Sequence, residues 1–580
     1  MAITSFYFLC FAAVLFAVYY LLPGKLQGPF LLLASIGYFL TAGSAYLILY
    51  PAVTITIIYG AALYIDRVKE QKKRKTVLSL VVVFCLLELT ALKYCNFGIY
   101  TYNAIAMRLF PGSSLLKTVQ AAAPLGISFY TLSLLGYLFD VYYEIGKPQK
   151  NFLKFALFGF YFPVIISGPI LRYRDVEQEL YAPHEFDYHK FTYGLQRMLW
   201  GFFKKLVIAE RLAVVVNTIY GDTDTYRGFY IVIAAIGFAF QLYADFSGGM
   251  DIVIGLSEAL GISLAENFDR PFFSKSIQEF WRRWHITLGA WLKDYLFYPL
   301  LRSKAFTKLQ ADCKKKFGKK WGKKLATFAA MFILWFAVGM WHGGAWKFIM
   351  GSGLIHWAYI VLGEAGEPLW KKLKAWCRVT DNTKWFALLQ QIRTFLLVSA
   401  SFVFFRASSF TDGLHSYRQM FADFNPEIFW NGSLLSLGLN GIELVITVVV
   451  LIGILRSRLQ CCGIYLQRLL RRQGNVKKTG FQIHIVLSSV CMHADTSHVY
   501  DAYKRCDKGH LYRLLCGAGR HNRCGDDRLQ PRVSLSFGPP DVGGERFYGI
   551  SSGKQCAAPE SSHSSGGGGI KDPVSGAVYF

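Results

Sequence analysis

A histidine followed by two glycines stands at the end of a long apolar segment, in the sequence MWHGGAW (340–346). About sixteen residues separate His342 from the lysines before this segment, and at ~1.5 Å each they carry the chain ~24 Å into a hydrocarbon layer ~30 Å thick. A histidine at that depth is expected to face a protein interior or a wet cavity, which makes it a candidate functional group. Gly343 and Gly344 are expected to end the helix and to let another backbone or a ligand approach closely. On position alone, a structural histidine hydrogen-bonded between helices is the alternative.

A second histidine lies in an aromatic and basic segment, FWRRWH (280–285). Four residues here have the i, i+3, i+4, i+7 spacing that places side chains on one face of a helix: Trp281, Trp284, His285 and Leu288. An aromatic face that carries a histidine can line a channel for an acyl chain or a thioester. Arg282 and Arg283 lie off the centre of this face, where guanidinium groups can bind phosphates or lipid head groups. The alternative is an interfacial helix whose tryptophans are membrane anchors.

Other polar groups within apolar segments are weaker candidates for chemistry. The segment QLYADFSGGMD (241–251) ends a long apolar run in two acids and a glycine pair, and two acids are too few to predict a metal site. It has no phosphate-binding loop pattern, and it predicts a broken membrane helix with a buried polar network. Ser128 and Ser167 have no neighbouring base in the sequence, so neither is a convincing nucleophile.

The chain that positions these residues has the composition of a membrane protein. Of 580 residues, 53% are hydrophobic and only 17% are charged, whereas soluble domains carry about a quarter charged residues. This excludes a disordered chain and argues against an ordinary cytosolic enzyme. Apolar segments, several of them near the ~20 residues of a spanning helix, recur at 1–22, 28–50, 51–66, 76–93, 120–143, 152–170, 192–218, 228–245, 325–341, 344–362, 384–405 and 440–456. The region 277–300 mixes aromatic with charged residues and is expected to be re-entrant, interfacial or buried.

The net charge of +26 comes from 63 Lys and Arg against 37 Asp and Glu. Such a surplus can indicate nucleic-acid binding, but here the basic residues cluster between apolar segments, at 67–75 and 314–324, as in cytoplasmic loops of membrane proteins. We therefore expect no nucleic-acid partner. Three spans precede the first cluster, so the N-terminus is expected outside. The first apolar segment lacks a basic n-region and a cleavage motif, and we interpret it as a retained membrane helix.

The chain changes character near residue 471. After that point come Gly-Gly pairs, scattered Cys and His residues, and a run of serines and glycines at 561–569. We therefore divide the chain into a membrane domain, 1–470, and an atypical tail, 471–580. The composition of the tail favours an out-of-frame translation product, and a disordered tail is the alternative. A small metal module is disfavoured because the Cys and His spacings match no zinc pattern.

At the residues described above, the sequence resembles the membrane-bound O-acyltransferase family, and within it the bacterial AlgI-like branch of alginate O-acetylation. The resemblance covers about residues 1–460 and is carried by PLGISFYTLSLLGYLFDVYY (124–143), ISGPILRY (166–173), the block from QLYADFSGG to YLFYPL (241–300), MWHGGAW (340–346) and FFRASS (404–409). It implies an all-α, polytopic membrane protein in which about 11–13 tilted transmembrane helices form a ring with re-entrant or interfacial helices. The tail after residue 471 resembles nothing in the family.

The resemblance also implies the chemistry. The catalytic histidine of the family maps onto His342, and its second histidine or asparagine position maps onto His285. Members of the family join a cytoplasmic donor pocket to an extracytoplasmic acceptor funnel at this histidine. That arrangement agrees with the depth expected for His342 from the length of the apolar segment before it.

Together these observations predict an enzyme, an O-acyltransferase of the cell membrane. His342 is expected to act as general base on an acceptor hydroxyl, and His285 to orient the donor or to protonate its leaving thiolate. The expected donor is acetyl-CoA or an acyl-carrier thioester, bound with help from four residues: Trp281, Arg282, Arg283 and Trp284. The expected acceptor is a cell-surface polysaccharide, reached directly or through an extracytoplasmic partner that resembles an SGNH hydrolase. The mechanism requires neither a bound cofactor nor a metal.

Three other functions remain compatible with the sequence. D-Alanyl transfer to teichoic acid keeps the enzyme class and changes the acyl group. A secondary transporter or lipid flippase also has broken helices and buried polar groups, but the sequence shows no convincing internal repeat. A non-catalytic scaffold for polysaccharide export predicts that acylation survives the loss of His342.

Overall fold

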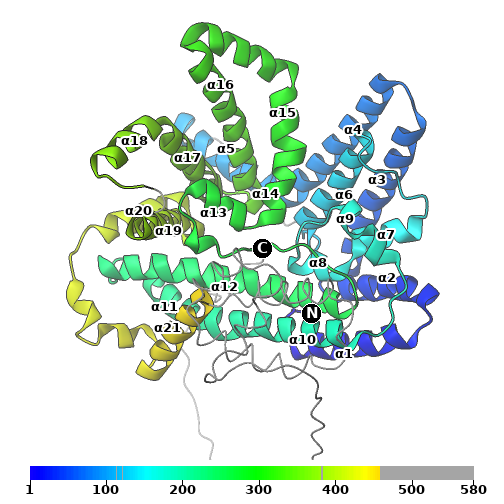
Figure 1. The fold of residues 1–580 in the computed structure, drawn as a ribbon, viewed down its shortest axis with the longest axis horizontal. Helices are drawn as coiled ribbons and strands as arrows, with labels where there is room; N and C mark the ends of the chain where they lie inside the picture. The colour runs from blue at the N-terminus through cyan, green and yellow to red at the C-terminus, as the bar shows by residue number, and fades with distance from the viewer. Residues whose placement is uncertain (113, 120–121, 381–382, 457–580) are drawn as a thin grey trace, which may run out of the picture. The chain divides into compact units, whose positions relative to one another are not determined.

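The computed structural model describes residues 1–456, except positions 113, 120–121 and 381–382. The expected tail, 471–580, and the end of the expected membrane domain lie outside the described residues. Across the described residues the chain is helical, and its β-type pairing is limited to one isolated bridge between Phe268 and Trp284 (Figure 1). The predicted all-α class is confirmed.

The first half of the chain leads into one long helix, α12. Its elements, in chain order, are α1 (Phe6–Leu21), α2 (Gly24–Leu40), η1 (Ala45–Ile48), α3 (Leu49–Arg67), α4 (Gln71–Leu89), η2 (Thr90–Tyr94), α5 (Cys95–Leu109), α6 (Ile127–Tyr142), α7 (Phe152–Phe160), α8 (Phe162–Ser167), α9 (Tyr173–Tyr181), α10 (Tyr188–Phe202), η3 (Phe203–Ala209), α11 (Glu210–Gly221) and α12 (Phe229–Ala259).

The second half carries both candidate histidines. Its elements are η4 (Pro271–Phe273), α13 (Ile277–Arg283), α14 (Ile286–Leu292), η5 (Lys293–Phe297), α15 (Tyr298–Arg302), α16 (Lys304–His342), η6 (Phe348–Leu354), α17 (Ile355–Ala365), α18 (Glu367–Trp376), α19 (Lys384–Arg406), α20 (Phe410–Met420), η7 (Pro426–Phe429), η8 (Ser433–Leu437) and α21 (Gly441–Arg456). The segments η2, η3, η5 and η6 are π-helical, and π-turns inside α-helices are frequent at functional sites.

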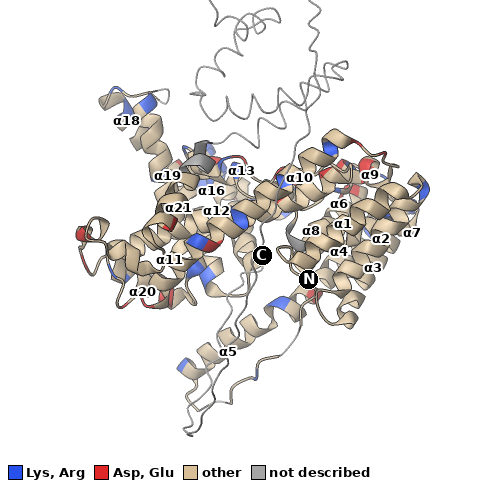
Figure 2. Cartoon of the chain, turned by 90° about the horizontal axis from the view of Figure 1, so that it is seen from below, with Lys and Arg blue, Asp and Glu red and all other residues tan. Residues whose placement is uncertain are grey.

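Six helical segments of the described chain are long and apolar enough to cross a membrane. They are Ala45–Arg67, Gln71–Leu109, Phe229–Ala259, Lys304–His342, Phe348–Ala365 and Lys384–Arg406, and shorter apolar helices such as α1 and α6 accompany them. Charged residues are few along α1, α2 and α3 (Figure 2). The predicted membrane character is therefore borne out, while the ring arrangement and the number of 11–13 spans stay predictions.

Two of the differences between the predicted segments and the observed helices bear on the candidate site. The span predicted over 76–93 continues through η2 and α5 to Leu109, so that Lys93 lies inside a helical segment and not at its end. The break predicted within 241–251 is wrong, because α12 runs through this stretch without interruption.

The glycines of α12 serve close packing instead of a break. A Cβ on Gly248 would lie 2.8 Å from the carbonyl oxygen of Gly201, and one on Gly255 would lie 2.5 Å from that of Gly194. Gly194 and Gly201 belong to α10, so the backbones of α10 and α12 touch along a stripe of small residues (Figure 1). Such stripes allow close helix approach in membranes.

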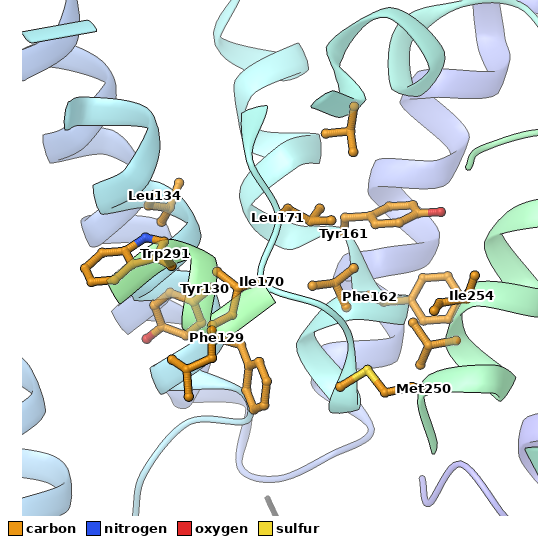
Figure 3. Close-up of a cluster of buried hydrophobic side chains, with 14 of the residues drawn as sticks. Phe129, Tyr130, Leu134, Tyr161, Phe162, Ile170, Leu171, Met250, Ile254 and Trp291 are labelled. Atoms are coloured by element: carbon orange, nitrogen blue, oxygen red, sulfur yellow. The ribbon is translucent and has the colours of Figure 1, made fainter. Parts of the chain in front are cut away.

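The interior side chains hold α6, α8, α12 and α14 against one another. Figure 3 shows part of this cluster, including Phe129 of α6, Met250 of α12 and Trp291 of α14, all of which are buried. Trp291 Nε1 also donates a hydrogen bond of 2.7 Å to the backbone carbonyl of Leu132. Because α14 begins directly after His285, this packing helps to fix the position of that histidine.

The helix that carries His342 is a hairpin. α16 folds back at Gly318, whose φ of 76° is in the left-handed region (Figure 1). A Cβ on Gly322 would lie 2.4 Å from the backbone nitrogen of Lys314, so the two arms pack closely beside the turn. The basic cluster 314–324 lies around this turn, and the second arm runs from it to His342.

Candidate active site

His342 is the last residue of α16, and the chain leaves the helix at Gly343. A Cβ on Gly343 would lie 2.6 Å from the ring of Phe348, and one on Gly344 would lie 3.0 Å from the Cβ atom of Phe97. The predicted helix end is confirmed. The groups that approach the two glycines most closely are phenylalanine side chains, whereas a backbone or a ligand was expected. Residue His342 as a whole is partly exposed, while its ring Nδ1 atom is buried.

The second candidate, His285, does not lie on a helix. α13 ends at Arg283, Trp284 is extended, and His285 takes a left-handed φ of 47° before α14 begins at Ile286. The predicted single helical face, on which Trp281, Trp284 and His285 would lie side by side, is therefore wrong. A left-handed conformation is uncommon for a residue other than glycine, and it persists where the surroundings over-determine it.

The break at His285 is imposed by Asn267. The backbone carbonyl of Asn267 accepts the N–H of Ile286 at 3.0 Å, and its side-chain Oδ1 accepts the N–H of Thr287 at 3.0 Å. The same Oδ1 accepts the Thr287 hydroxyl at 2.9 Å and His285 Nδ1 at 3.2 Å. Asn267 is only 1% exposed, so one buried amide organises this turn. The helical spacing misled the prediction because it gives no information on these long-range bonds.

The same bonds fix the proton on His285. The backbone N–H of Thr287 requires an acceptor, so the amide oxygen of Asn267 faces it, and His285 Nδ1 must then carry a proton and donate it. His285 is 2% exposed, and a charged ring at such a position would be costly, which favours the neutral form. His285 Nε2 therefore presents a lone pair, and no described residue hydrogen-bonds to it.

The indole of Trp341 joins the two histidines. Its ring lies 5.1 Å from the ring of His342 and 5.3 Å from that of His285, edge-on to both. The ring of Phe405, in α19, meets His342 at 5.4 Å. The structure thus brings both sequence-predicted histidines to one aromatic side chain.

The four residues predicted to bind the donor have different surroundings. Trp284 is 3% exposed and packs within the aromatic core, and Arg283 is paired with Glu279 at 2.7 Å. Of the four, Arg282 is the exposed member, and Trp281, which is partly buried, has a buried indole N–H that no described residue accepts. A donor-binding role stays a prediction for all four.

The buried polar network predicted near 241–251 is present. Asp251, which is 1% exposed, accepts a hydrogen bond from Arg197 at 2.9 Å and pairs with Lys204 at 2.5 Å. Arg197 also donates to Glu266 at 2.7 and 2.6 Å. Two cations and two carboxylates compensate each other, and they tie α12 to α10 and η3. We interpret this network as structural, and residues 1–456 contain no cluster of three or more His, Cys, Asp or Glu suited to a metal ion.

Two polar side chains near the histidines were not singled out from the sequence. Lys93, in η2, donates a hydrogen bond of 2.6 Å to the backbone carbonyl of Trp341. His356, in α17, is fully buried, with Nε2 2.9 Å from Ser401 Oγ and its ring 4.8 Å from that of Trp281. Both lie inside apolar segments, and an ionisable residue in such a segment is the signal that could have identified them.

The described chain is helical, has several long apolar segments, and brings two histidines together at the end of one of them. The chain belongs to the membrane-bound O-acyltransferase family, whose family model matches residues 35–311. It is therefore a multi-pass membrane acyltransferase, as the sequence motifs predicted.

Relatives with three different names are similar to this chain. The probable alginate O-acetylase AlgI of Azotobacter vinelandii is 33% identical over 414 residues, which is 71% of this chain and 76% of the relative. The peptidoglycan O-acetyltransferase of Helicobacter pylori is 27% identical over 72% of this chain and 79% of its own length. The teichoic acid D-alanyltransferase of Bacillus subtilis is 29% identical over 49% of this chain and 69% of its own length.

Proposed function

We propose that this protein transfers an acetyl group from a cytoplasmic thioester to a hydroxyl group of an extracytoplasmic polysaccharide. The observation that carries the proposal is the position of His342 at the end of a membrane helix, where Trp341 contacts both its ring and that of a neutral His285. Similarity to a probable alginate O-acetylase over 71% of the chain supports the acetyl group and the polysaccharide acceptor.

In the proposed reaction, His342 removes the proton of the acceptor hydroxyl while the hydroxyl oxygen attacks the thioester carbonyl carbon. The carbonyl oxygen becomes negatively charged in the tetrahedral intermediate. This intermediate collapses, the carbon–sulfur bond breaks, and the thiolate leaves. The proton held by His342 passes to the sulfur, so that an ester and a free thiol are the products.

The tautomer inferred from the hydrogen bonds of Asn267 favours one of the two roles expected for His285. Because Nδ1–H is bound to Asn267, the neutral ring can accept a hydrogen bond at Nε2 and has no proton there to give to a thiolate. We infer that His285 orients a substrate by accepting an O–H or N–H group. Trp281 and Arg282 remain the proposed contacts of the donor.

The donor is acetyl-CoA or an acyl-carrier thioester, which share the same reactive group. The acetyl group reaches the polysaccharide directly or through an extracytoplasmic partner that resembles an SGNH hydrolase. Membranes that contain this chain, with and without such a partner, would distinguish the two routes.

The test follows labelled acetyl transfer from the thioester to extracytoplasmic polymer in such membranes. His342→Ala should lower the rate at least ~100-fold at an unchanged protein level, because general-base catalysis supplies about that much. His415→Ala is the matched control, since the His415 side chain is 43% exposed and far from any proposed role, and it should transfer at the wild-type rate. Equal transfer by wild type and His342→Ala would refute the assignment and favour a scaffold. Incorporation of D-alanine in place of acetate would favour the teichoic acid alternative.

A further inference from the structure

Lys93 places an ammonium group inside an apolar helical segment, next to His342. It lies in η2, within Gln71–Leu109. Its Nζ atom donates to the backbone carbonyl of Trp341 at 2.6 Å and to Ser128 Oγ at 3.0 Å, and it lies 5.8 Å from the centre of the Trp341 ring. An ammonium group has three N–H donors, so one donor remains beyond these two contacts.

The depth of Lys93 along its helix matches that of His342. Lys93 lies eighteen positions after Lys75, the last of the first basic cluster, and His342 lies eighteen positions after Lys324, the last of the second. At ~1.5 Å per residue, both side chains lie ~27 Å from the basic ends of their helices. Since both basic clusters are expected on the cytoplasmic face, the cation and the imidazole reach the same level.

The contact with Trp341 is a contact with the end of a helix. The last four carbonyl groups of an α-helix have no partner within it, and the Trp341 carbonyl is among those of α16. A cation also interacts favourably with the negative end of the helix dipole. Lys93 therefore holds the end of α16 that carries His342, and Ser128 of α6 holds the ammonium group in turn.

Within the part of the chain that the structure describes, no carboxylate forms an ion pair with Lys93. Three other cations packed between the helices are paired with carboxylates, Arg197 and Lys204 with Asp251 and Lys205 with Asp245. Lys347, like Lys93, donates to a backbone carbonyl instead. An isolated charge at membrane depth is costly, and such residues mark functional sites. The proposed reaction supplies the missing anion, because negative charge develops first on the thioester carbonyl oxygen and then on the sulfur.

We propose that Lys93 is the electrostatic partner of His342 in acyl transfer. Its bond to Trp341 positions the end of α16, and its remaining N–H stabilises the negative charge of the tetrahedral intermediate and of the leaving thiolate. The inference rests on the proposed function. The proton still travels from the hydroxyl group through His342 to the sulfur, and Lys93 keeps its own protons throughout.

The test measures kcat and KM for the thioester donor in proteoliposomes that contain the full chain. Lys93→Met should lower kcat by ~10²–10³-fold, the loss typical of removing one donor to a developing oxyanion, and should change KM less than about threefold. The matched control is Lys347→Met. Lys347 is also partly buried and donates to a backbone carbonyl, that of Ala407, at 2.6 Å. Because the role of Lys347 is expected to be structural, Lys347→Met should keep kcat per folded molecule within about threefold of the wild-type value.

A second variant separates charge from folding. Lys93→Cys, purified in the folded state, is treated with an aminoethyl or an ethyl methanethiosulfonate, and wild type is treated in parallel to account for the native cysteines. The aminoethyl adduct should have a kcat at least ~10-fold above that of untreated Lys93→Cys, and the ethyl adduct should leave kcat unchanged. Equal effects of the two reagents, or a Lys93→Met kcat within threefold of wild type, would overturn the role of Lys93. If His342→Ala were also fully active, the proposed function itself would fail.

Discussion

Asn267 offers the most direct test of how the site is built. Replacing Asn267 with alanine removes the oxygen that accepts three buried donors from Thr287 and His285. The Thr287 hydroxyl can rotate toward another acceptor. Two N–H groups, the backbone N–H of Thr287 and Nδ1–H of His285, are then left without a hydrogen-bond acceptor. A buried donor without a partner costs about 1–3 kcal/mol. We therefore expect Asn267→Ala to destabilise the protein by about 2–6 kcal/mol.

Thermal unfolding in detergent and the rate of acyl transfer measure the two consequences. Asn267→Asp keeps an acceptor for both N–H groups and should lose less stability than Asn267→Ala. Asn103→Ala is the matched control. Asn103 Oδ1 also accepts a backbone N–H, that of Leu116 at 2.9 Å, but on an exposed part of the chain where water can replace it, so the change should cost less than about 1 kcal/mol.

The activity of the same variants tests the role of His285. Without the bond to Asn267 the imidazole can rotate, and a displacement of ~1 Å at a reacting group costs on the order of 100-fold in rate. The structural reasoning would be refuted if Asn267→Ala unfolded at the wild-type temperature, or if it lost no more stability than Asn103→Ala. A stable Asn267→Ala variant with the wild-type transfer rate would refute the positioning of His285.

Two further changes test the packing that supports the site. Asp251→Asn leaves Lys204 and Arg197 without their shared carboxylate and should destabilise the protein by about 3–5 kcal/mol, with partial recovery in the double variant that adds Lys204→Met. Wild-type accumulation and unfolding of the single variant would show that the network is not structural. Gly339→Ala, one turn before His342, places a Cβ 2.6 Å from the backbone of η6 and should cost about 1–3 kcal/mol together with much of the activity. Gly363→Ala, with no atom within 4 Å of the added Cβ, is its control, and equal effects of the two would contradict the packing.

The helical class and the membrane character could be predicted because they depend on composition and on apolar runs, which are local properties of the sequence. The end of α16 at His342 was predictable for the same reason, since two glycines follow it. The boundaries were less accurate where a polar residue lies inside a helix. The segment 76–93 was given an end at Lys93, and 241–251 was given a break, although long-range partners satisfy the polar groups in both places.

The geometry at His285 could not be predicted from spacing. The residues 281–288 fit a helical face, but Asn267 offers the backbone and side chains of 285–287 a set of bonds that a continuous helix would forgo. The choice between a continuous helix and this turn depends on Asn267, which lies eighteen positions before His285. The periodicity of residues 281–288 carries no information on it. The sequence identified the two histidines as candidates, whereas their meeting at Trp341 is a property of the fold.

Two groups of polar side chains between the helices differ in how far their members satisfy one another. Around Asp251, two cations and two carboxylates satisfy one another, and a closed set of this kind stabilises packing. Around Trp341, the described residues leave several polar groups open: the charge of Lys93, the Nε2 lone pair of His285 and the indole N–H of Trp341. A membrane interior penalises each open group, so their clustering is unfavourable for folding alone. It becomes favourable when the substrates supply an O–H or N–H group to His285 and a developing anion to Lys93, while the acceptor hydroxyl gives its proton to His342.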